Sequence, residues 1–148
     1  MISLKELAEN IDMSNPEMEA VLNLKTGKII LITDEYVSAV DKEDIPDWMS
    51  DIIPDVKDYL NNPDNYINLP NQHDFDGYRA MKNFVNSLPD SQEQEVLQKA
   101  IIGKGAFRQF KEKIGFLGVE DQWYKFKEAA ITEFAKDWAK DNDIQFTE

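Results

Sequence analysis

Apolar residues recur along this chain with two different periods. In the first third, short runs alternate with a period near two, which is typical of strands. In residues 74–140, apolar positions repeat every three or four residues, which is typical of helices. The pattern therefore predicts an α+β fold with a small antiparallel sheet near the N-terminus and packed helices making up the C-terminal half.

Strands are expected in three places. Residues 17–24 and 28–33 flank a tight turn in which Gly27 supplies the positive φ of a β-hairpin. Residues 29–32 are apolar on both faces, so we expect a central strand that is covered on each side. A third, short strand is expected at residues 66–69.

Capping residues and apolar periodicity predict the helices. Ser3 and Glu6 have the spacing of a capping box, so a helix is expected to begin there. The expected helical segments are residues 3–11, 36–40, 48–60 with a bend or split near Pro54, 74–88 or 76–88, 91–101, the segment after Gly105, and about 121–140. The last two are expected to turn these side chains inward: Phe107, Phe110, Ile114, Trp123, Phe126, Ala130, Phe134 and Trp138.

Length and composition favour one globular domain over residues 1–148. Hydrophobic residues make up 42% of the chain, which suffices for a core without a metal or disulfides. The chain has no cysteine, which excludes disulfides, thiolate metal sites and cysteine nucleophiles. Its first residues do not resemble a signal peptide, and the longest apolar run, Ile29–Ile32, is far too short to span a membrane. We therefore expect a soluble cytoplasmic protein without a cofactor.

The charge of the chain is negative and uneven. The formal net charge is −13 at pH 7, and residues 34–64 hold ten carboxylates against two lysines. Such a chain is repelled at long range by nucleic acid and by anionic lipid. The acidic segment is interpreted either as a solvated surface or as a surface that meets a basic partner or imitates nucleic acid.

The single histidine lies in a loop with two carboxylates. His73, Asp74 and Asp76 admit two interpretations, a metal- or phosphate-dependent active site or an ordinary helix start. In the second interpretation the carboxylates cap the next helix and His73 is exposed. A metal site normally needs three or four convergent ligands, which favours the helix start.

One local cluster of basic residues interrupts the acidic chain. Lys104, Arg108 and Lys111 lie close together in the sequence, and the last two are three residues apart on the outer face of a predicted helix. Arg79 and Tyr124 are expected beside them. This basic–aromatic surface is a candidate site for a phosphate, an acidic ligand or an acidic partner. Alternatively, Arg108 and Lys111 pair with the protein's own carboxylates.

The common catalytic patterns are missing from the sequence. It has no Gly-x-Ser-x-Gly, no Ser/His/Asp arrangement and no dinucleotide fingerprint. Gly103-Lys104-Gly105 is superficially like a phosphate-binding turn, but a predicted helix precedes it and no Lys-Ser/Thr follows it. These glycines are better interpreted as a helix end. We therefore expect a protein that is not an enzyme.

Several segments carry a resemblance to a known family. They are Tyr66–Pro70, Tyr78–Val85, Ala100–Lys111 and Trp123–Phe126, and the turn at Lys25–Gly27 and the closing Ala135–Trp138 also fit. Together they resemble uncharacterised protein family 0158, a bacterial family of unknown function. The resemblance extends from about Glu17 onward and is weakest over residues 34–62. It implies a small cytoplasmic bacterial protein and supplies no catalytic residues.

The residues and the resemblance together favour a small non-enzymatic binding or adaptor domain. Its expected partner is a protein, recognised through the basic–aromatic surface, and neither nucleic acid nor a membrane is expected. One competing hypothesis is a metal- or phosphate-dependent enzyme that uses His73, Asp74 and Asp76. The other is an acidic inhibitor that imitates nucleic acid through residues 34–64.

Overall fold

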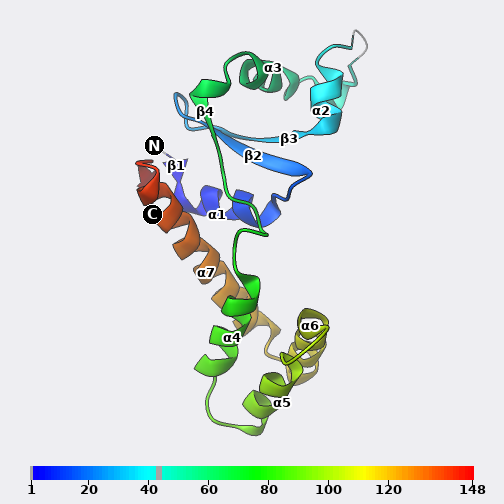
Figure 1. Ribbon diagram of the computed structural model, residues 1–148, viewed down its shortest axis with the longest axis vertical. Coiled ribbons are helices and arrows are strands. Elements are labelled where there is room, and N and C mark those ends of the chain that lie inside the picture. Colours follow the sequence, from blue (N-terminus) through cyan, green and yellow to red (C-terminus); the bar gives the residue numbers. More distant parts are fainter. Residues whose placement is uncertain (1, 43–44) are drawn as a thin grey trace. The chain divides into compact units, whose positions relative to one another are not determined.

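The computed structural model describes residues 2–42 and 45–148 (Figure 1). The chain divides into two compact units. Unit 1 comprises residues 1–75 and 134–148, and unit 2 comprises residues 76–133. The expectation of a single domain over residues 1–148 stays a prediction.

Unit 1 contains the strands and the shorter helices. Its elements are β1 (Ile2–Ser3), α1 (Leu4–Met13), β2 (Met18–Asn23), β3 (Ile29–Thr33), α2 (Asp34–Ala39), the 3₁₀ turn η1 (Asp47–Met49), α3 (Ile53–Asn61), the 3₁₀ turn η2 (Pro63–Asn65), β4 (Tyr66–Asn68) and β5 (Phe146–Thr147). Unit 2 is helical and contains α4 (Gly77–Ser87), α5 (Gln92–Ala100) and α6 (Ala106–Leu117), while α7 (Glu120–Asp141) begins in unit 2 and ends in unit 1. The predicted α+β class is therefore confirmed.

The three-stranded sheet of unit 1 has the order β3-β2-β4, and both pairings are antiparallel (Figure 1). The predicted hairpin and third strand are confirmed, but β3 lies at an edge, so the prediction that residues 29–32 form a central strand is wrong. Ile30 and Ile32 are buried on one face, whereas Ile29 and Leu31 on the other are half-buried. An apolar pattern reports the burial of a strand's faces and not the number of strands beside it.

A second, two-stranded sheet was not predicted. Strand β1 pairs in parallel with β5, so that Ile2 lies opposite Phe146 and Ser3 opposite Thr147. The sheet content is therefore not confined to the early part of the chain. Two-residue strands carry no periodic signal, and this pairing depends on the two ends of the chain meeting in space.

Local sequence signals account for the turns and helix starts of unit 1. Gly27 has a φ of +78°, as the hairpin turn requires. Ser3 caps α1, because its hydroxyl accepts a hydrogen bond from the Glu6 amide over 3.4 Å. The predicted helix at residues 48–60 is split: η1 ends at Met49, and α3 begins at Ile53 with Pro54 in its first turn.

The core of unit 1 forms where the sheet meets its helices. Val21, Ile30, Ile32 and Val56 form one buried cluster, against which Tyr36 and other side chains of α2 and α3 pack. Figure 1 shows α2 and α3 on one side of this sheet and α1 on the other. Full burial of each such aliphatic side chain contributes about 1.5–3 kcal/mol, so these layers stabilise the sheet that the hairpin begins.

Unit 2 is built around an aromatic cluster. The Phe110 ring lies edge-on to the Trp123 ring, with 4.9 Å between the centroids, and Phe84 contacts both of these rings and Phe126. Phe84, Phe110 and Trp123 are buried, and Phe126 is half-buried. Packed aromatic pairs add about 0.5–1.5 kcal/mol beyond the area that they bury. The cluster thus joins α4, α6 and α7.

Two expectations about inward-facing side chains need correction. Phe107 was expected to be buried, but it is 50% exposed, because it lies at the flank of the buried stripe formed by Ala106, Phe110 and Ile114. In α7 the most buried positions after Trp123 are Ile131, Ala135 and Ala139, whereas Phe126, Ala130, Phe134 and Trp138 are half-buried. Small residues permit the closest approach of a helix, and a large ring at the flank remains partly exposed.

In the part of the chain that the structure describes, no helix is both long enough and apolar enough to cross a membrane.

Candidate functional site

All five residues of the predicted basic–aromatic surface lie in unit 2. Arg79 is in the first turn of α4, Lys104 precedes α6, Arg108 and Lys111 are on α6, and Tyr124 is in the first turns of α7. Every one of these side chains is exposed. Arg108 and Lys111 are three residues apart on one helix, so they are neighbours on the side of α6 that faces away from Phe110.

No carboxylate in the described part of the chain neutralises the cations of this surface. Within residues 2–42 and 45–148, neither Arg79, Lys104, Arg108 nor Lys111 forms an ion pair. Glu112 lies one helical turn from Arg108, and yet these two side chains are not paired in the structure. The four charges are therefore available to an external anion.

An aromatic pair adjoins these charges, and the sequence did not reveal it. The rings of Tyr78 and Phe107 lie 6.3 Å apart between centroids at 69°, and they are 40% and 50% exposed. The Tyr78 hydroxyl donates to the Ile101 carbonyl over 3.0 Å, and Lys82 Nζ lies 5.8 Å from the Tyr78 ring centroid. Phe107 is one helical turn before Lys111, so apolar and cationic groups alternate on this face.

The position of Tyr124 relative to these cations stays a prediction. Its side chain is 54% exposed on α7, next to the buried Trp123. In the described residues, no hydrogen bond or ring contact joins Tyr124 to Arg108 or Lys111. The exposed aromatic residues next to these cations along the chain are instead Tyr78, which precedes Arg79, and Phe107, which precedes Arg108. Both residues lie at the flank of an apolar helical stripe, and this position in the sequence could have indicated that their rings are partly exposed.

The His73 loop has the arrangement of an ordinary helix start. Asp74 Oδ2 accepts a hydrogen bond from the Asn71 amide over 2.8 Å, and Asp76 Oδ1 caps α4 by accepting from the Arg79 amide over 3.0 Å. The His73 side chain is exposed. Among the described residues, no group of three or more His, Asp or Glu side chains is placed to hold a metal ion. Both carboxylates thus have a structural role.

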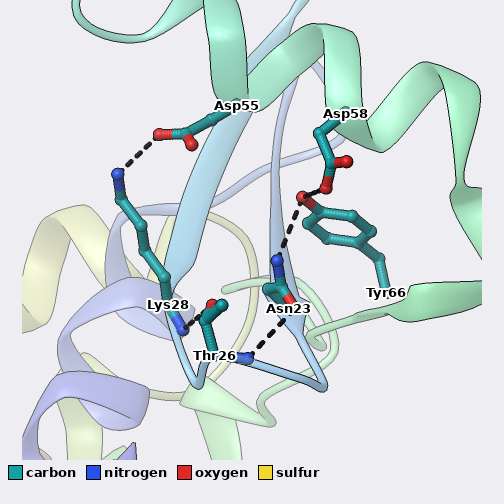
Figure 2. Close-up of polar contacts among 6 residues, drawn as sticks. All are labelled: Asn23, Thr26, Lys28, Asp55, Asp58 and Tyr66. Carbon is teal, nitrogen blue, oxygen red and sulfur yellow. Dashed lines mark hydrogen bonds and ion pairs between the residues drawn. The ribbon is translucent and has the colours of Figure 1, made fainter.

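The acidic segment presents most of its carboxylates to solvent. The exposed residues are Asp34, Glu35, Asp41, Asp47, Asp51, Asp58 and Asp64, while Asp55 is half-buried and Glu43 and Asp44 lie outside the described residues. Asp55 is paired with Lys28, with 2.5 Å between Oδ2 and Nζ (Figure 2). The segment includes both α2 and α3, and seven of its ten carboxylates are exposed.

A polar network that the sequence did not predict joins β2, α3 and β4 (Figure 2). The Tyr66 hydroxyl donates to Asp58 Oδ2 over 2.6 Å and accepts from Asn23 Nδ2 over 3.2 Å. Burial, together with the hydrogen bond to Asp58 and its charge, raises the pKa of Tyr66 to about 12. Asn62 donates to the other Asp58 oxygen over 3.1 Å. Each of these groups has a partner within unit 1, so the network has a structural role. We call its residues, Asn23, Asp58, Asn62 and Tyr66, the polar clamp.

Comparison with known proteins shows the family of the chain. The model of an uncharacterised protein family, UPF0158, matches residues 1–148. The UPF0158 protein PA5073 of Pseudomonas aeruginosa is 25% identical over 145 residues, which cover 97% of this chain and 84% of that protein. No solved structure matches the chain.

Proposed function

This chain belongs to the uncharacterised protein family UPF0158, and from its surface chemistry we infer that it is a non-enzymatic binding domain. The proposed recognition surface comprises Arg79, Lys104, Arg108, Lys111 and Tyr124, extended by the Tyr78–Phe107 pair. The proposed partner is an acidic segment of another protein in the cytoplasm. The family's description assigns no activity. The exposure, charge and pairing of the side chains therefore support this proposal.

One observation carries the proposal: four exposed cations, which have no carboxylate partner among the described residues, lie on a protein whose net charge is −13. Elsewhere in the described residues, Lys5, Lys28 and Lys136 each contact a carboxylate. Single unpaired lysines such as Lys25 and Lys57 also occur among the described residues, but Arg108 and Lys111 are two such cations side by side on one helix. Such a cluster favours an acidic ligand, because complementary charge raises the rate of encounter and fixes orientation.

The aromatic pair favours a protein partner over a simple anion. Tyr and Phe side chains that are partly exposed beside Arg and Lys are typical of interface centres, where aromatic and Arg residues contribute most of the affinity. Phe107 and Tyr78 offer apolar area, and Lys111 and Arg108 offer charge-assisted hydrogen bonds. Nucleic acid is disfavoured, because the net charge of −13 repels a polyanion at long range.

The proposal is tested by capture of partners from a bacterial lysate with wild type and with an Arg108→Glu, Lys111→Glu variant. A matched control, Lys25→Glu with Lys57→Glu, makes the same change in net charge on exposed lysines of unit 1. We expect a partner that binds wild type and the control and is lost with the Arg108, Lys111 variant. Circular dichroism must first show that all three proteins are folded. Retention of every partner by the Arg108, Lys111 variant contradicts the proposal.

Two further measurements separate the competing hypotheses. Calorimetry with millimolar Mg²⁺, Mn²⁺ and Zn²⁺ tests the enzyme that would use His73, Asp74 and Asp76, since that hypothesis requires binding to one of them. An inhibitor that imitates nucleic acid through residues 34–64 predicts a basic partner whose binding weakens steeply with salt and survives the Arg108, Lys111 variant.

A further inference from the structure

Strand β3 directs one row of its backbone groups away from the sheet. In an antiparallel pair, residues alternate between hydrogen-bonded and non-bonded positions. The Asn23 amide donates to the Lys28 carbonyl over 2.8 Å, so Lys28 is at a hydrogen-bonded position. Every second residue of β3 after Lys28 is then hydrogen-bonded to β2 as well. Ile30 therefore exchanges hydrogen bonds with β2, whereas the N–H and C=O groups of Ile29 and Leu31 point outward.

The outward groups have no partner in the part of the chain that the structure describes. Strand β3 pairs with β2 alone, and no hydrogen bond to the backbone of Ile29 or Leu31 is formed within residues 2–42 and 45–148. Both side chains are half-buried on the face opposite the Ile30–Ile32 core. The strand thus offers unpaired donors and acceptors next to apolar area.

The two edges of the same sheet differ in how they are protected. The β4 edge has three residues, it ends in the polar Asn68, and prolines lie close on both sides at 63 and 70. The β3 edge has five residues, Ile-Ile-Leu-Ile-Thr, with no proline, glycine or charge. Proteins normally blunt exposed edges with prolines, charges or short strands, and unprotected edges pair with other strands. The β3 edge has the composition of a strand that is covered.

We propose that β3 pairs antiparallel with β3 of a second copy of this chain, joining two three-stranded sheets into one of six strands. The self-complementary register centres on Leu31, so that Leu31 of each copy exchanges two backbone hydrogen bonds with the other. Ile29 then lies opposite Thr33 of the second copy. In this register the strand contributes outward backbone groups at alternate positions, as antiparallel pairing requires.

The charges at the ends of β3 select this occupant. The residue before the strand is Lys28 and the residue after it is Asp34, which begins α2. With Leu31 at the two-fold axis, Lys28, which pairs with Asp55 of its own chain, lies opposite Asp34 of the second copy at both ends, so that Asp34 would add a second carboxylate to this ion pair. Opposite charges across strands stabilise a pairing, and like charges weaken it. A second β3 therefore matches this edge in length, in apolar character and in charge.

The absence of cysteine from the chain makes a direct test available. Leu31→Cys places one thiol per copy at the two-fold axis, where Cα atoms about 5.5 Å apart are within disulfide range. Mild oxidation should give a covalent dimer of twice the 17.1 kDa chain mass. Asn68→Cys, on the β4 edge, is the matched control and should remain mainly monomeric. Equal cross-linking of the two variants, or none with Leu31→Cys, would overturn the proposal.

A reversible measurement complements the cross-link. Sedimentation equilibrium of the cysteine-free protein should show a monomer–dimer equilibrium. Leu31→Lys should weaken it by about tenfold or more, since like charges then meet at the axis. Asn68→Lys should leave it unchanged. Asp34→Lys should also weaken the dimer, because it places a like charge opposite Lys28 at both ends. A wild-type monomer throughout the concentration range, or a dimer insensitive to Leu31→Lys, contradicts this interface.

Discussion

The polar clamp of unit 1 and the basic–aromatic surface of unit 2 use similar residues in opposite ways. In the clamp, hydrogen bonds join Tyr66 to Asn23 and to Asp58 (Figure 2). Close to the clamp, Lys28 forms an ion pair with Asp55. On the surface of unit 2, Arg108 and Lys111 contact no carboxylate in the described residues. A polar group with a partner within its own unit stabilises that unit, whereas a charge without one remains available for recognition.

This difference has consequences for mutations. Substitutions in the clamp should lower the free energy of unfolding, because they leave partly buried groups without partners. Substitutions on the unit 2 surface should alter binding and leave stability almost unchanged, because no internal contact is lost. The scaffold below that surface should respond like any closely packed core.

The largest expected effect is in the scaffold of unit 2. Phe110→Ala removes a ring that is 1% exposed and contacts Phe84 and Trp123, so it should cost about 3–5 kcal/mol in the free energy of unfolding. Phe116→Ala, on the same helix but 86% exposed, is the control and should cost less than about 0.5 kcal/mol. Urea unfolding followed by circular dichroism measures both. Equal effects of the two substitutions would show that Phe110 is not a core residue.

The next largest effect is expected in the clamp. Tyr66→Phe removes the hydroxyl that joins Asn23 to Asp58, and we expect a loss of about 1–2 kcal/mol in the free energy of unfolding. Tyr124→Phe removes a hydroxyl that makes no hydrogen bond among the described residues and should be neutral. Denaturant titration of the three proteins checks the difference. A neutral Tyr66→Phe would show that the clamp does not stabilise unit 1.

A smaller effect is expected in the pH dependence of stability. The pKa of Tyr66 is about 12 in the folded protein and 10.0 for an unperturbed tyrosine, so the folded state holds this proton more tightly. The stabilisation is complete below pH 10 and is lost as the pH rises through 12. The difference in unfolding free energy between wild type and Tyr66→Phe should therefore shrink over this range. A constant difference would mean that the hydroxyl keeps its proton in both states or titrates alike in both.

The smallest effect is expected on the unit 2 surface. The Arg108→Glu, Lys111→Glu variant should unfold within about 0.5 kcal/mol of wild type, because neither side chain has an ion-pair partner among the described residues. Thermal and urea unfolding at low salt provide the measurement. A loss well above this value would reveal an internal role for these cations and remove the contrast with the clamp.

Local chemistry predicted the elements well. The hairpin with Gly27, the cap at Ser3 and the helix starts at Asp76 and Ser91 depend on residues within a few positions of each other. The exposure of the basic residues also followed from helical spacing, as Arg108 and Lys111 show. The aromatic pair of Tyr78 and Phe107 was missed, because the flank of an apolar stripe can be either buried or exposed.

By itself, the sequence determined the α+β class, the order of the helices and of the three strands of the main sheet, the acidic character and the basic cluster at Lys104–Lys111, since each depends on composition or on short-range spacing. Only the tertiary structure decided that β3 is an edge strand, that β1 pairs with β5 and that Tyr66 joins Asn23 to Asp58. These features bring together residues far apart in the chain. Periodicity indicates which face of a helix or strand is apolar. The packing of the whole unit determines which other element covers that face.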